Sequence, residues 1–320
     1  MNILGIDIGG TKIEVCVARE DGEFLAWRRI PTKAQRGPEP ILKEIILTAR
    51  QLLEEVNLKK DDLTGIGVSA PGPLNPEKGI IYQAPNMPGW VNLPVKKILE
   101  DKFGGPVFLE NDANASCLAE WKFGAGKGFR DMVFLTMSTG IGGGLILDNR
   151  LYRGANFFAG EVGHQYILPE GPVCGCGKRG HLEALCSGSG MTKRLKELVG
   201  KEKGQMWEMV LGDLEKLSPE ILIEAAKEKD PLACRFLDQT INYLAYGLSN
   251  LIFILNPQAI ILGTIVAKTE GLIIRPLRRR VNELCWDVLT GELKILPALL
   301  TQKPGSYASL SVALEGLGKW

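Results

Sequence analysis

A run of acids and amides near the middle of the chain is suited to deprotonating an alcohol. Glu110-Asn111-Asp112-Ala113-Asn114 follows the apolar segment 107–109 and precedes a helical pattern. Phosphoryl transfer to an alcohol needs a carboxylate that accepts the hydroxyl proton and donors that orient the acceptor, and Asp112 with Asn111 supplies both. Asp112 equally fits an N-cap of the helix that begins at Ala113, because aspartate is favoured there.

Two glycine-rich turns are candidate phosphate sites. In the first, Asp7-Ile8-Gly9-Gly10-Thr11-Lys12, the glycines let backbone amides approach an anion, and Thr11 and Lys12 add donors. A plain hairpin turn explains the two glycines as well. Asp7 favours the phosphate interpretation, because an acid beside a phosphate requires a cation between them. The segment therefore predicts ATP bound with magnesium.

The second turn is Ser138-Thr139-Gly140-Ile141-Gly142-Gly143-Gly144. Its spacing does not match GxGxxG, and no Gly-Lys-Ser/Thr segment exists in the chain, so a Rossmann dehydrogenase and a P-loop NTPase are disfavoured. One such turn in each of two lobes predicts ATP held between them. The candidate nucleotide-binding residues are Asp7, Gly9, Gly10, Thr11, Lys12, Ser138, Thr139, Gly140, Gly142 and Gly143.

Both histidines of the chain lie in one cysteine-containing region. Two sulfur and two nitrogen ligands suit tetrahedral zinc, although a reduced, metal-free glycine loop is the alternative. The zinc would be structural and would hold a loop whose Glu161, His164 and Glu183 are candidates for contacts with sugar hydroxyls. The predicted ligands are His164, Cys174, Cys176 and His181, with Cys186 as the reserve for His181.

The patterns around these residues predict two α/β lobes. Apolar alternation predicts an opening hairpin over residues 3–17, then a helix over 41–56 and strands at 66–68 and 107–109. The Pro71-Gly72 loop and Asp112 follow the last two strands. We expect a first lobe of residues 1–123 with a final helix of 305–320 packed on it, and a second lobe of 124–304 with a zinc loop at 164–183. Hinges are expected near 124–128 and 303–305.

Composition excludes several classes of protein. The chain has 320 residues, 45% of them hydrophobic and 23% charged, with a formal net charge of +1, so it is an ordinary globular protein without a predicted nucleic-acid partner. The segment Met1 to Asp7 does not resemble a signal peptide, and the apolar stretch 244–255 is too short to span a bilayer. Seven cysteines, three in apolar patterns, suit a reducing cytoplasm.

Taken in their order, these segments resemble the ROK family of sugar kinases and related repressors, within the actin-like ATPase superfamily. The resemblance covers nearly the whole chain. It implies two actin-like (ribonuclease H-like) lobes with a cleft between them, Asp112 as the base, and Asn111, Glu161, His164 and Glu183 as sugar-binding residues. It also implies that His164 serves zinc through its other nitrogen, and that the protein forms dimers or tetramers.

Two positions depart from the pattern of the family. His181 stands where a third cysteine is common, which would leave the zinc site with one negative charge fewer. Gly263-Thr264 stands where relatives often have a longer glycine run near the adenosine, so Gly263 is a further candidate nucleotide-binding residue.

The expected reaction is ATP-dependent phosphorylation of a hexose, with glucose converted to glucose 6-phosphate. N-acetylmannosamine, other N-acetylhexosamines, fructose and allose are alternative substrates, and the loop Asn86 to Trp90, together with Gly72, is expected to lie at the sugar. A repressor is disfavoured because only six residues precede Asp7, too few for a DNA-binding module. A regulatory, chaperone-like ATPase is the other rival, against which Asn111, Asp112 and the zinc loop favour a sugar acceptor.

Overall fold

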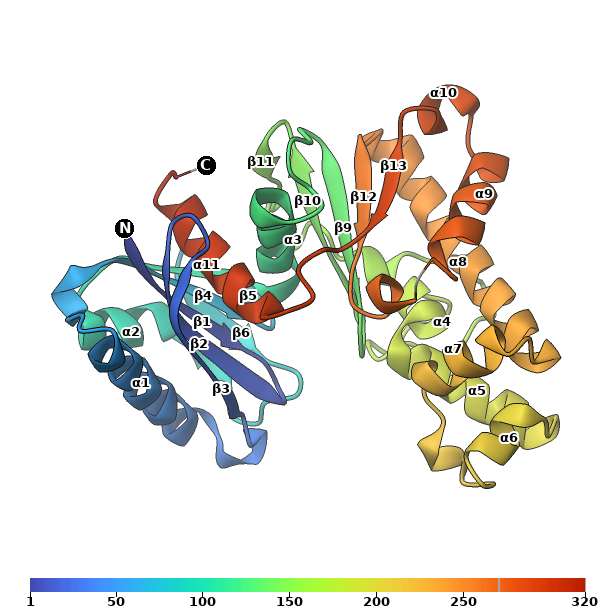
Figure 1. The fold of residues 1–320 in the computed structure, drawn as a ribbon, viewed down its shortest axis with the longest axis horizontal. Helices are drawn as coiled ribbons and strands as arrows, with labels where there is room; N and C mark the ends of the chain where they lie inside the picture. Colours follow the sequence, from blue (N-terminus) through green and yellow to red (C-terminus); the bar gives the residue numbers. More distant parts are fainter. Residues whose placement is uncertain (270, 320) are drawn as a thin grey trace. The chain divides into compact units, whose positions relative to one another are not determined.

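The computed structural model describes residues 1–269 and 271–319, which form two compact units. The first unit contains Met1–Gly128, Gly144–Gly160 and the chain from Leu299 onward, and the second contains Phe129–Gly143 and Glu161–Ala298. Neither unit is therefore one continuous stretch of sequence, as the colours of Figure 1 show. Both helices and strands are present, so the predicted α/β class is confirmed.

The first unit is built on a five-stranded mixed sheet in the order β3-β2-β1-β4-β8. As the alternating pattern predicted, β1 and β2 form an antiparallel hairpin, while β4 and then β8 continue the sheet in parallel with β1. Because the carboxyl ends of β1, β4 and β8 meet at one edge, their terminal residues are brought together. The strands are β1 (Asn2–Ile8), β2 (Lys12–Arg19), β3 (Phe24–Pro31), β4 (Leu63–Ala70) and β8 (Val107–Asn111).

Helices cover both faces of this sheet, and alternate residues of β1 supply both cores. Leu4 and Ile6 are buried in the core that includes α1 (Pro38–Glu55) and α2 (Val95–Phe103), whereas Ile3 packs with Leu310 of α11 (Pro304–Gly316). Gly67 of β4 lets α11 approach closely, because a Cβ there would lie 1.9 Å from the carbonyl oxygen of Ser309. Figure 1 shows α3 (Asp112–Phe123) beside α11.

A small antiparallel sheet and a second five-stranded sheet complete the strands. The small sheet, in the order β5-β6-β7, precedes α2 and includes the loop of Asn86. The five-stranded sheet has the order β11-β10-β9-β12-β13. These strands are β5 (Leu74–Asn75), β6 (Ile80–Gln83), β7 (Val91–Leu93), β9 (Met132–Met137), β10 (Ile141–Leu147), β11 (Arg150–Leu151), β12 (Ala259–Leu262) and β13 (Lys294–Pro297).

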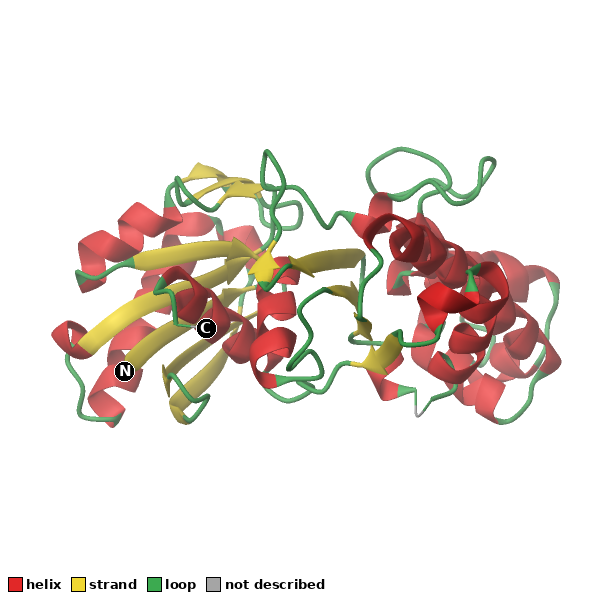
Figure 2. Cartoon of the chain, turned by 90° about the horizontal axis from the view of Figure 1, so that it is seen from above, coloured by secondary structure: helices red, strands yellow, loops and turns green. Residues whose placement is uncertain are grey.

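The second unit is largely helical (red in Figure 2). Its longest helix ends at Leu255 and is followed by the C-cap Asn256, whose φ of 44° is left-handed and which precedes Pro257. Within the described ranges, no helix has both the length and the apolar character that crossing a bilayer requires. The helices are α4 (Leu182–Cys186), α5 (Gly188–Lys201), α6 (Gln205–Met209), α7 (Pro219–Lys227), α8 (Pro231–Leu255), α9 (Ile274–Leu284) and α10 (Asp287–Thr290).

Two local predictions were wrong by a few residues. The glycines of the second turn do not all lie in the turn, since β10 begins at Ile141 and takes in Gly142 to Gly144. The helix after β8 begins at Asp112 rather than at Ala113, and its N-cap is Asn111. In both cases the strand or helix includes residues, glycines in β10 and Asp112 in α3, whose types usually mark the end of such an element.

A buried glutamate binds two segments of the first unit, one shortly before the chain passes into the second unit and one just after it returns. Glu120, near the end of α3, is 3% exposed. Its carboxylate accepts hydrogen bonds from the backbone N–H of Ala125 at 2.8 Å, of Leu299 at 3.2 Å and of Leu300 at 2.8 Å. Gly124 must be glycine here, because a Cβ would lie 2.0 Å from the Oε2 atom of Glu120. The expected flexible break at 124–128 is thus tied at its start.

Replacing this acceptor should destabilise the protein. We expect Glu120→Ala to lower the free energy of unfolding by about 2–3 kcal/mol, because three backbone donors lose their partner, and Glu120→Gln to cost roughly half as much. Urea denaturation followed by circular dichroism measures both. Glu54→Ala, which removes an exposed glutamate of α1, is the control and should change stability by less than about 0.5 kcal/mol. Equal effects of Glu120→Ala and the control would contradict the role given to Glu120.

Candidate active site

The predicted base lies at the carboxyl end of β8, and its neighbour performs the capping. The Oδ1 atom of Asn111 accepts hydrogen bonds from the backbone N–H of Ala113 at 2.9 Å and of Asn114 at 3.3 Å. Asp112 is the first residue of α3 and is exposed, with its Oδ1 atom 2.9 Å from the N–H of Ala113. The cap is therefore Asn111, and the carboxylate of Asp112 lies at the positive end of the helix dipole.

A buried ion pair behind Asn111 supports this strand end. Glu110 is 2% exposed and accepts hydrogen bonds from Asn114 Nδ2 at 3.1 Å and from Arg153 Nε at 2.6 Å. Arg153 also donates to Glu315 of α11 at 2.9 Å. Arg153 and Glu315 were not among the predicted residues, and Glu110 was named only as part of its motif. Their separation of 43 and 162 residues leaves no local pattern to reveal the contacts.

Asp7 ends β1 at the same edge of the sheet. In the parallel registers it is opposite Ser69, which in turn is opposite Glu110, and the Ser69 hydroxyl donates to Asp7 Oδ1 at 2.7 Å. Burial raises the pKa of Asp7 to about 7; the charges of Glu14 and Asp112 act in the same direction, whereas Ser69 and Lys12 oppose it. This carboxyl is therefore partly protonated near neutral pH, and a cation beside it would favour its ionised form.

The first glycine turn is tight at Gly9 and adjoins the Asn86 loop at Gly10. The N–H of Gly9 donates to the carbonyl of Lys12 at 3.0 Å, and a Cβ on Gly9 would lie 2.8 Å from that oxygen. A Cβ on Gly10 would lie 3.4 Å from that of Asn86. Thr11 is exposed at the tip. The predicted phosphate turn and the predicted sugar loop are therefore neighbours.

Gly72 contacts the other side of this edge. A Cβ there would lie 3.3 Å from Asn111 Nδ2, so the glycine leaves room for that amide. Because the Oδ1 atom of Asn111 is occupied by the cap, its NH₂ group is the part that faces the Gly72 loop. The first unit thus contributes one set of candidate site residues: Asp7, Gly10, Gly72, Asn86 and Asn111.

Lys12 forms an ion pair with the buried Glu14. Its Nζ atom is 3.5 Å from Glu14 Oε1, and Glu14 is fully buried. Glu14 also accepts hydrogen bonds from Arg29 at 2.8 Å and from the backbone N–H of Ser306 at 3.1 Å. Burial alone would raise the pKa of Glu14, but the hydrogen bonds of Arg29 and Ser306 and the charge of Lys12 outweigh it and lower that pKa. Glu14 thus ties the hairpin to the N-terminus of α11, a link that the sequence did not reveal.

The second glycine turn is anchored within the second unit. The carbonyl of Ser138 accepts from the N–H of Gly188 at 2.7 Å, and that of Thr139 accepts from the Ser189 hydroxyl at 2.7 Å. Glu183 accepts from the N–H of Ile141 at 3.0 Å. The start of α5 and the predicted sugar-binding acid therefore both hold this turn. Gly140 must lack a side chain, since its Cβ would lie 2.5 Å from Glu183 Oε2.

A cavity of about 980 Å³ opens beside Ser138 and Thr139. Its walls come from α5, from α7 and from the segment 264–269, so Gly263 immediately precedes it. Four lysines that the sequence analysis missed are among its lining residues: Lys193, Lys196, Lys227 and Lys268. The volume suits a small organic ligand, and the four lysines outnumber the two acids of the lining, Glu220 and Glu224, which suits an anionic one. Their wide separation along the chain hid the site.

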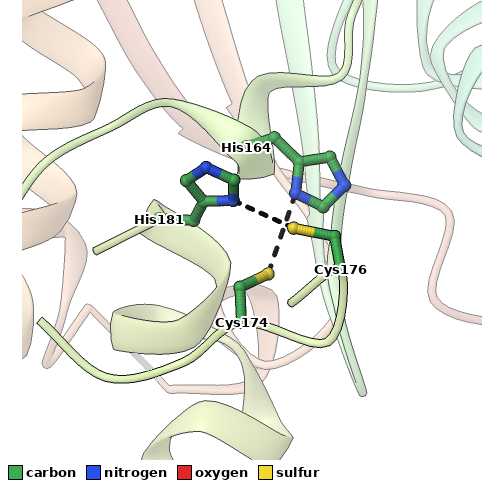
Figure 3. Close-up of side chains that lie close together, drawn as sticks. All are labelled: His164, Cys174, Cys176 and His181. Atoms are coloured by element: carbon green, nitrogen blue, oxygen red, sulfur yellow. Dashed lines mark hydrogen bonds between the residues drawn. The ribbon is translucent and has the colours of Figure 1, made fainter. Parts of the chain in front are cut away.

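The four predicted metal ligands lie together in the second unit (Figure 3). Their nitrogen and sulfur atoms are all within 4.8 Å of one another; Cys174 Sγ is 3.8 Å from His164 Nδ1, and Cys176 Sγ is 3.3 Å from His181 Nδ1. Tetrahedral zinc places its ligand atoms roughly 3.3–3.8 Å apart, so the set fits that metal. The reserve ligand Cys186 is not part of the cluster, because it is buried with its thiol toward the carbonyl of Thr240.

Acidic side chains surround this cluster. His164 Nε2 is 3.9 Å from Glu161 Oε2, so the ring has one nitrogen toward the cluster and the other toward a half-exposed acid. Cys174 Sγ is 3.2 Å from Glu183 Oε1. Burial, opposed by a backbone hydrogen bond with Cys176, and the nearby Glu183 raise the pKa of the Cys174 thiol to about 12. Metal binding would therefore have to displace that proton.

Comparisons with known proteins agree with this arrangement. The model of the ROK family matches residues 3–315. The chain is 33% identical over 318 residues to a glucokinase of Thermotoga maritima, covering 99% of both chains. Xylose repressors also match, including that of Bacillus subtilis, 30% identical over 314 residues that are 98% of this chain and 77% of the repressor.

Solved structures extend the likeness to the fold. The ROK hexokinase of Thermus thermophilus is similar with a TM-score of 0.84 at 31% identity, over the full length of both chains. A ROK family glucokinase of Streptomyces griseus, in complex with glucose and AMPPNP, is similar with a TM-score of 0.80 at 30% identity, over 99% of this chain and 100% of that one. The two-lobed sugar-kinase fold and the family expected from the motifs are confirmed. The chain belongs to the ROK family.

Proposed function

We propose that this protein is an ATP-dependent hexose kinase that converts glucose to glucose 6-phosphate. The observation that carries the proposal is the position of Asp112, whose exposed carboxylate lies at the N-terminus of α3 and at the carboxyl end of β8. A carboxylate exposed at a strand end is what a base for an alcohol requires. Similarity to glucokinases supports sugar-kinase activity in general.

In the proposed mechanism, Asp112 accepts the proton of the attacking sugar hydroxyl, and the NH₂ group of Asn111 donates to a neighbouring hydroxyl. Glu110 and Arg153 keep this strand end in place, because they fix Asn114 and the backbone N–H of Asn111. Asp7 would hold magnesium with ATP, through water, and magnesium would neutralise charge on the phosphates.

The nucleotide is proposed to occupy the cavity beside Ser138 and Thr139. The backbone of the two glycine turns would meet the phosphates, and the lysines that line the cavity would complement their charge. Phosphoryl transfer then requires residues of both units to act on one pair of substrates. The predicted hinges remain part of this proposal.

The sugar is proposed to bind through Glu161, His164 and Glu183 of the second unit and through Asn86 and Gly72 of the first. Carboxylates and an imidazole accept hydrogen bonds from several hydroxyls, which suits an unsubstituted pyranose such as glucose. The alternatives are N-acetylmannosamine, other N-acetylhexosamines, fructose and allose. A regulator that senses sugar without phosphorylating it is the second candidate, and the match to xylose repressors is the observation that favours it.

Zinc is proposed to be structural and to be held by His164, Cys174, Cys176 and His181. Four protein ligands leave no open position for substrate, so the ion would fix the loop that carries Glu161 and Glu183. We further propose a cytoplasmic homo-oligomer, dimeric or tetrameric. The seven cysteines all lie in the described residues and none is paired in a disulfide, which suits a reducing compartment.

The reaction is tested by ADP release in the presence and absence of sugars. We expect ADP to form only with sugar, and kcat/KM to be highest for glucose among glucose, N-acetylmannosamine, N-acetylglucosamine, fructose and allose. A sugar-independent rate of equal size would contradict a kinase, and sugar binding without any ADP would favour the regulator.

The base is tested by Asp112→Asn. We expect kcat to fall by at least about 100-fold while the KM for glucose changes little, because the amide keeps the size of the side chain but cannot take the proton. Asp101→Asn, at an exposed aspartate of α2, is the matched control and should keep full activity. Turnover that survives in Asp112→Asn would falsify this assignment.

The metal site is tested by elemental analysis of the purified protein. We expect about one zinc per chain, a large loss in His181→Ala, and retention in His181→Cys, because a thiolate also binds zinc. Cys234→Ala, an exposed cysteine outside the cluster, should keep its zinc. Undiminished zinc in His181→Ala would remove His181 as a ligand.

A further inference from the structure

Thr32 lies directly after β3 and is fully buried beside the first glycine turn. Its hydroxyl donates to the carbonyl of Gly9 at 2.6 Å, and its backbone N–H donates to the carbonyl of Thr11 at 3.0 Å. A single residue, 23 positions beyond Gly9, therefore satisfies two carbonyl groups of this turn. No local pattern reveals these contacts, and Thr32 was not among the predicted site residues.

A third carbonyl of the turn is satisfied within the turn itself. The N–H of Gly9 donates to the carbonyl of Lys12 at 3.0 Å, so the carbonyl groups of Gly9, Thr11 and Lys12 all have donors. In the described part of the chain, the N–H groups of Gly10 and Thr11 take part in no backbone hydrogen bond. The turn therefore has these three acceptors occupied and two donors remaining.

This division of donors and acceptors suits an anion. Backbone N–H groups attract a phosphate, whereas a carbonyl oxygen that faced it would repel it. The carbonyl of Gly9 and the N–H of Gly10 belong to one planar trans peptide unit, so they point in opposite directions. Because the hydroxyl of Thr32 holds that carbonyl toward the buried side, the N–H of Gly10 is directed away from the interior.

The backbone of Thr32 is in turn held by α1. Its carbonyl accepts a hydrogen bond from the Arg36 guanidinium at 3.0 Å, and Arg36 forms an ion pair with Glu44 of α1 at 2.6 Å. Two adjacent glycines have little conformational preference of their own, so a contact from outside the turn is needed to fix their peptide groups. The hydroxyl of Thr32 supplies this contact from an anchored position.

We propose that Thr32 is a positioning residue for the phosphates of the nucleotide, because it holds the peptide unit between Gly9 and Gly10 with its N–H toward the anion. The proposal rests on the proposed function, in which the backbone of this turn meets the phosphates. Thr32 is buried and acts only through the turn. Loss of its hydroxyl should therefore weaken the binding of the phosphates and leave the binding of the nucleoside unchanged.

The experiment measures the Kd of AMPPNP with magnesium, and of adenosine, by titration calorimetry in the wild type, Thr32→Val and Thr32→Ser. Thr32→Val replaces the hydroxyl by a methyl group of similar size. We expect it to raise the Kd of AMPPNP about 5- to 10-fold, the value of roughly one hydrogen bond, and to leave that of adenosine within twofold. Thr32→Ser keeps the hydroxyl and should bind AMPPNP within twofold of the wild type.

A matched control and a kinetic readout separate positioning from a general loss of structure. Thr48→Val, at another buried threonine of the first unit, in α1, should leave both Kd values within twofold. In glucose-dependent ADP release, Thr32→Val should raise the KM for ATP by about the same factor as the Kd of AMPPNP, while the KM for glucose changes less than twofold.

Three results would overturn the proposal: a Kd of AMPPNP in Thr32→Val within twofold of the wild type, an equal rise for AMPPNP and adenosine, or a Thr32→Ser variant that binds AMPPNP as weakly as Thr32→Val. Calorimetry needs no turnover, so a wild type that binds AMPPNP but forms no ADP with any sugar refutes the proposed function alone. A wild type that does not bind AMPPNP refutes both.

Discussion

Parallel hydrogen bonding among β1, β4 and β8 determines where the chemistry of the first unit lies. The registers place Asp7 beside Ser69 and Ser69 beside Glu110, so that residues about 40 to 60 positions apart share one sheet edge. A shift of one residue in either pairing would turn these side chains to the opposite face of the sheet. The turn at Gly9, the loop at Gly72 and the cap at Asn111 all begin where these strands end.

Three buried glutamates, Glu14, Glu110 and Glu120, stabilise the first unit in the same way. A buried carboxylate is costly unless donors satisfy it, and Glu14, Glu110 and Glu120 are each satisfied by backbone N–H groups, sometimes with an arginine. Each also joins segments that are remote in sequence. These carboxylates would destabilise the fold if they were buried without donors, but with their donors in place they hold remote segments of the chain together.

Local patterns predicted the elements and the chemical residue types well. Alternating apolar residues identified the opening hairpin, and the two-cysteine, two-histidine spacing identified the cluster around His164. The sequence offered Asp112 as a possible N-cap, whereas the structure gives that position to Asn111; both residue types cap helices, and neighbouring positions differ only in backbone geometry. Arg153, Ser306 and the lysines of the cavity were missed, because their partners are brought near by the tertiary fold and leave no periodic signal.

The discontinuity of the first unit has a consequence for synthesis. Its buried Glu14 emerges early from the ribosome, but Ser306, which donates to Glu14, belongs to α11, as does Glu315, the partner of Arg153. Ile3 is likewise covered only after Leu310 has been synthesised. Until α11 has been synthesised, one face of the sheet lacks its covering helix and Glu14 lacks the donors of Ser306, so the first strands cannot complete their core. Packing of α11 therefore completes the folding of strands that were synthesised long before it.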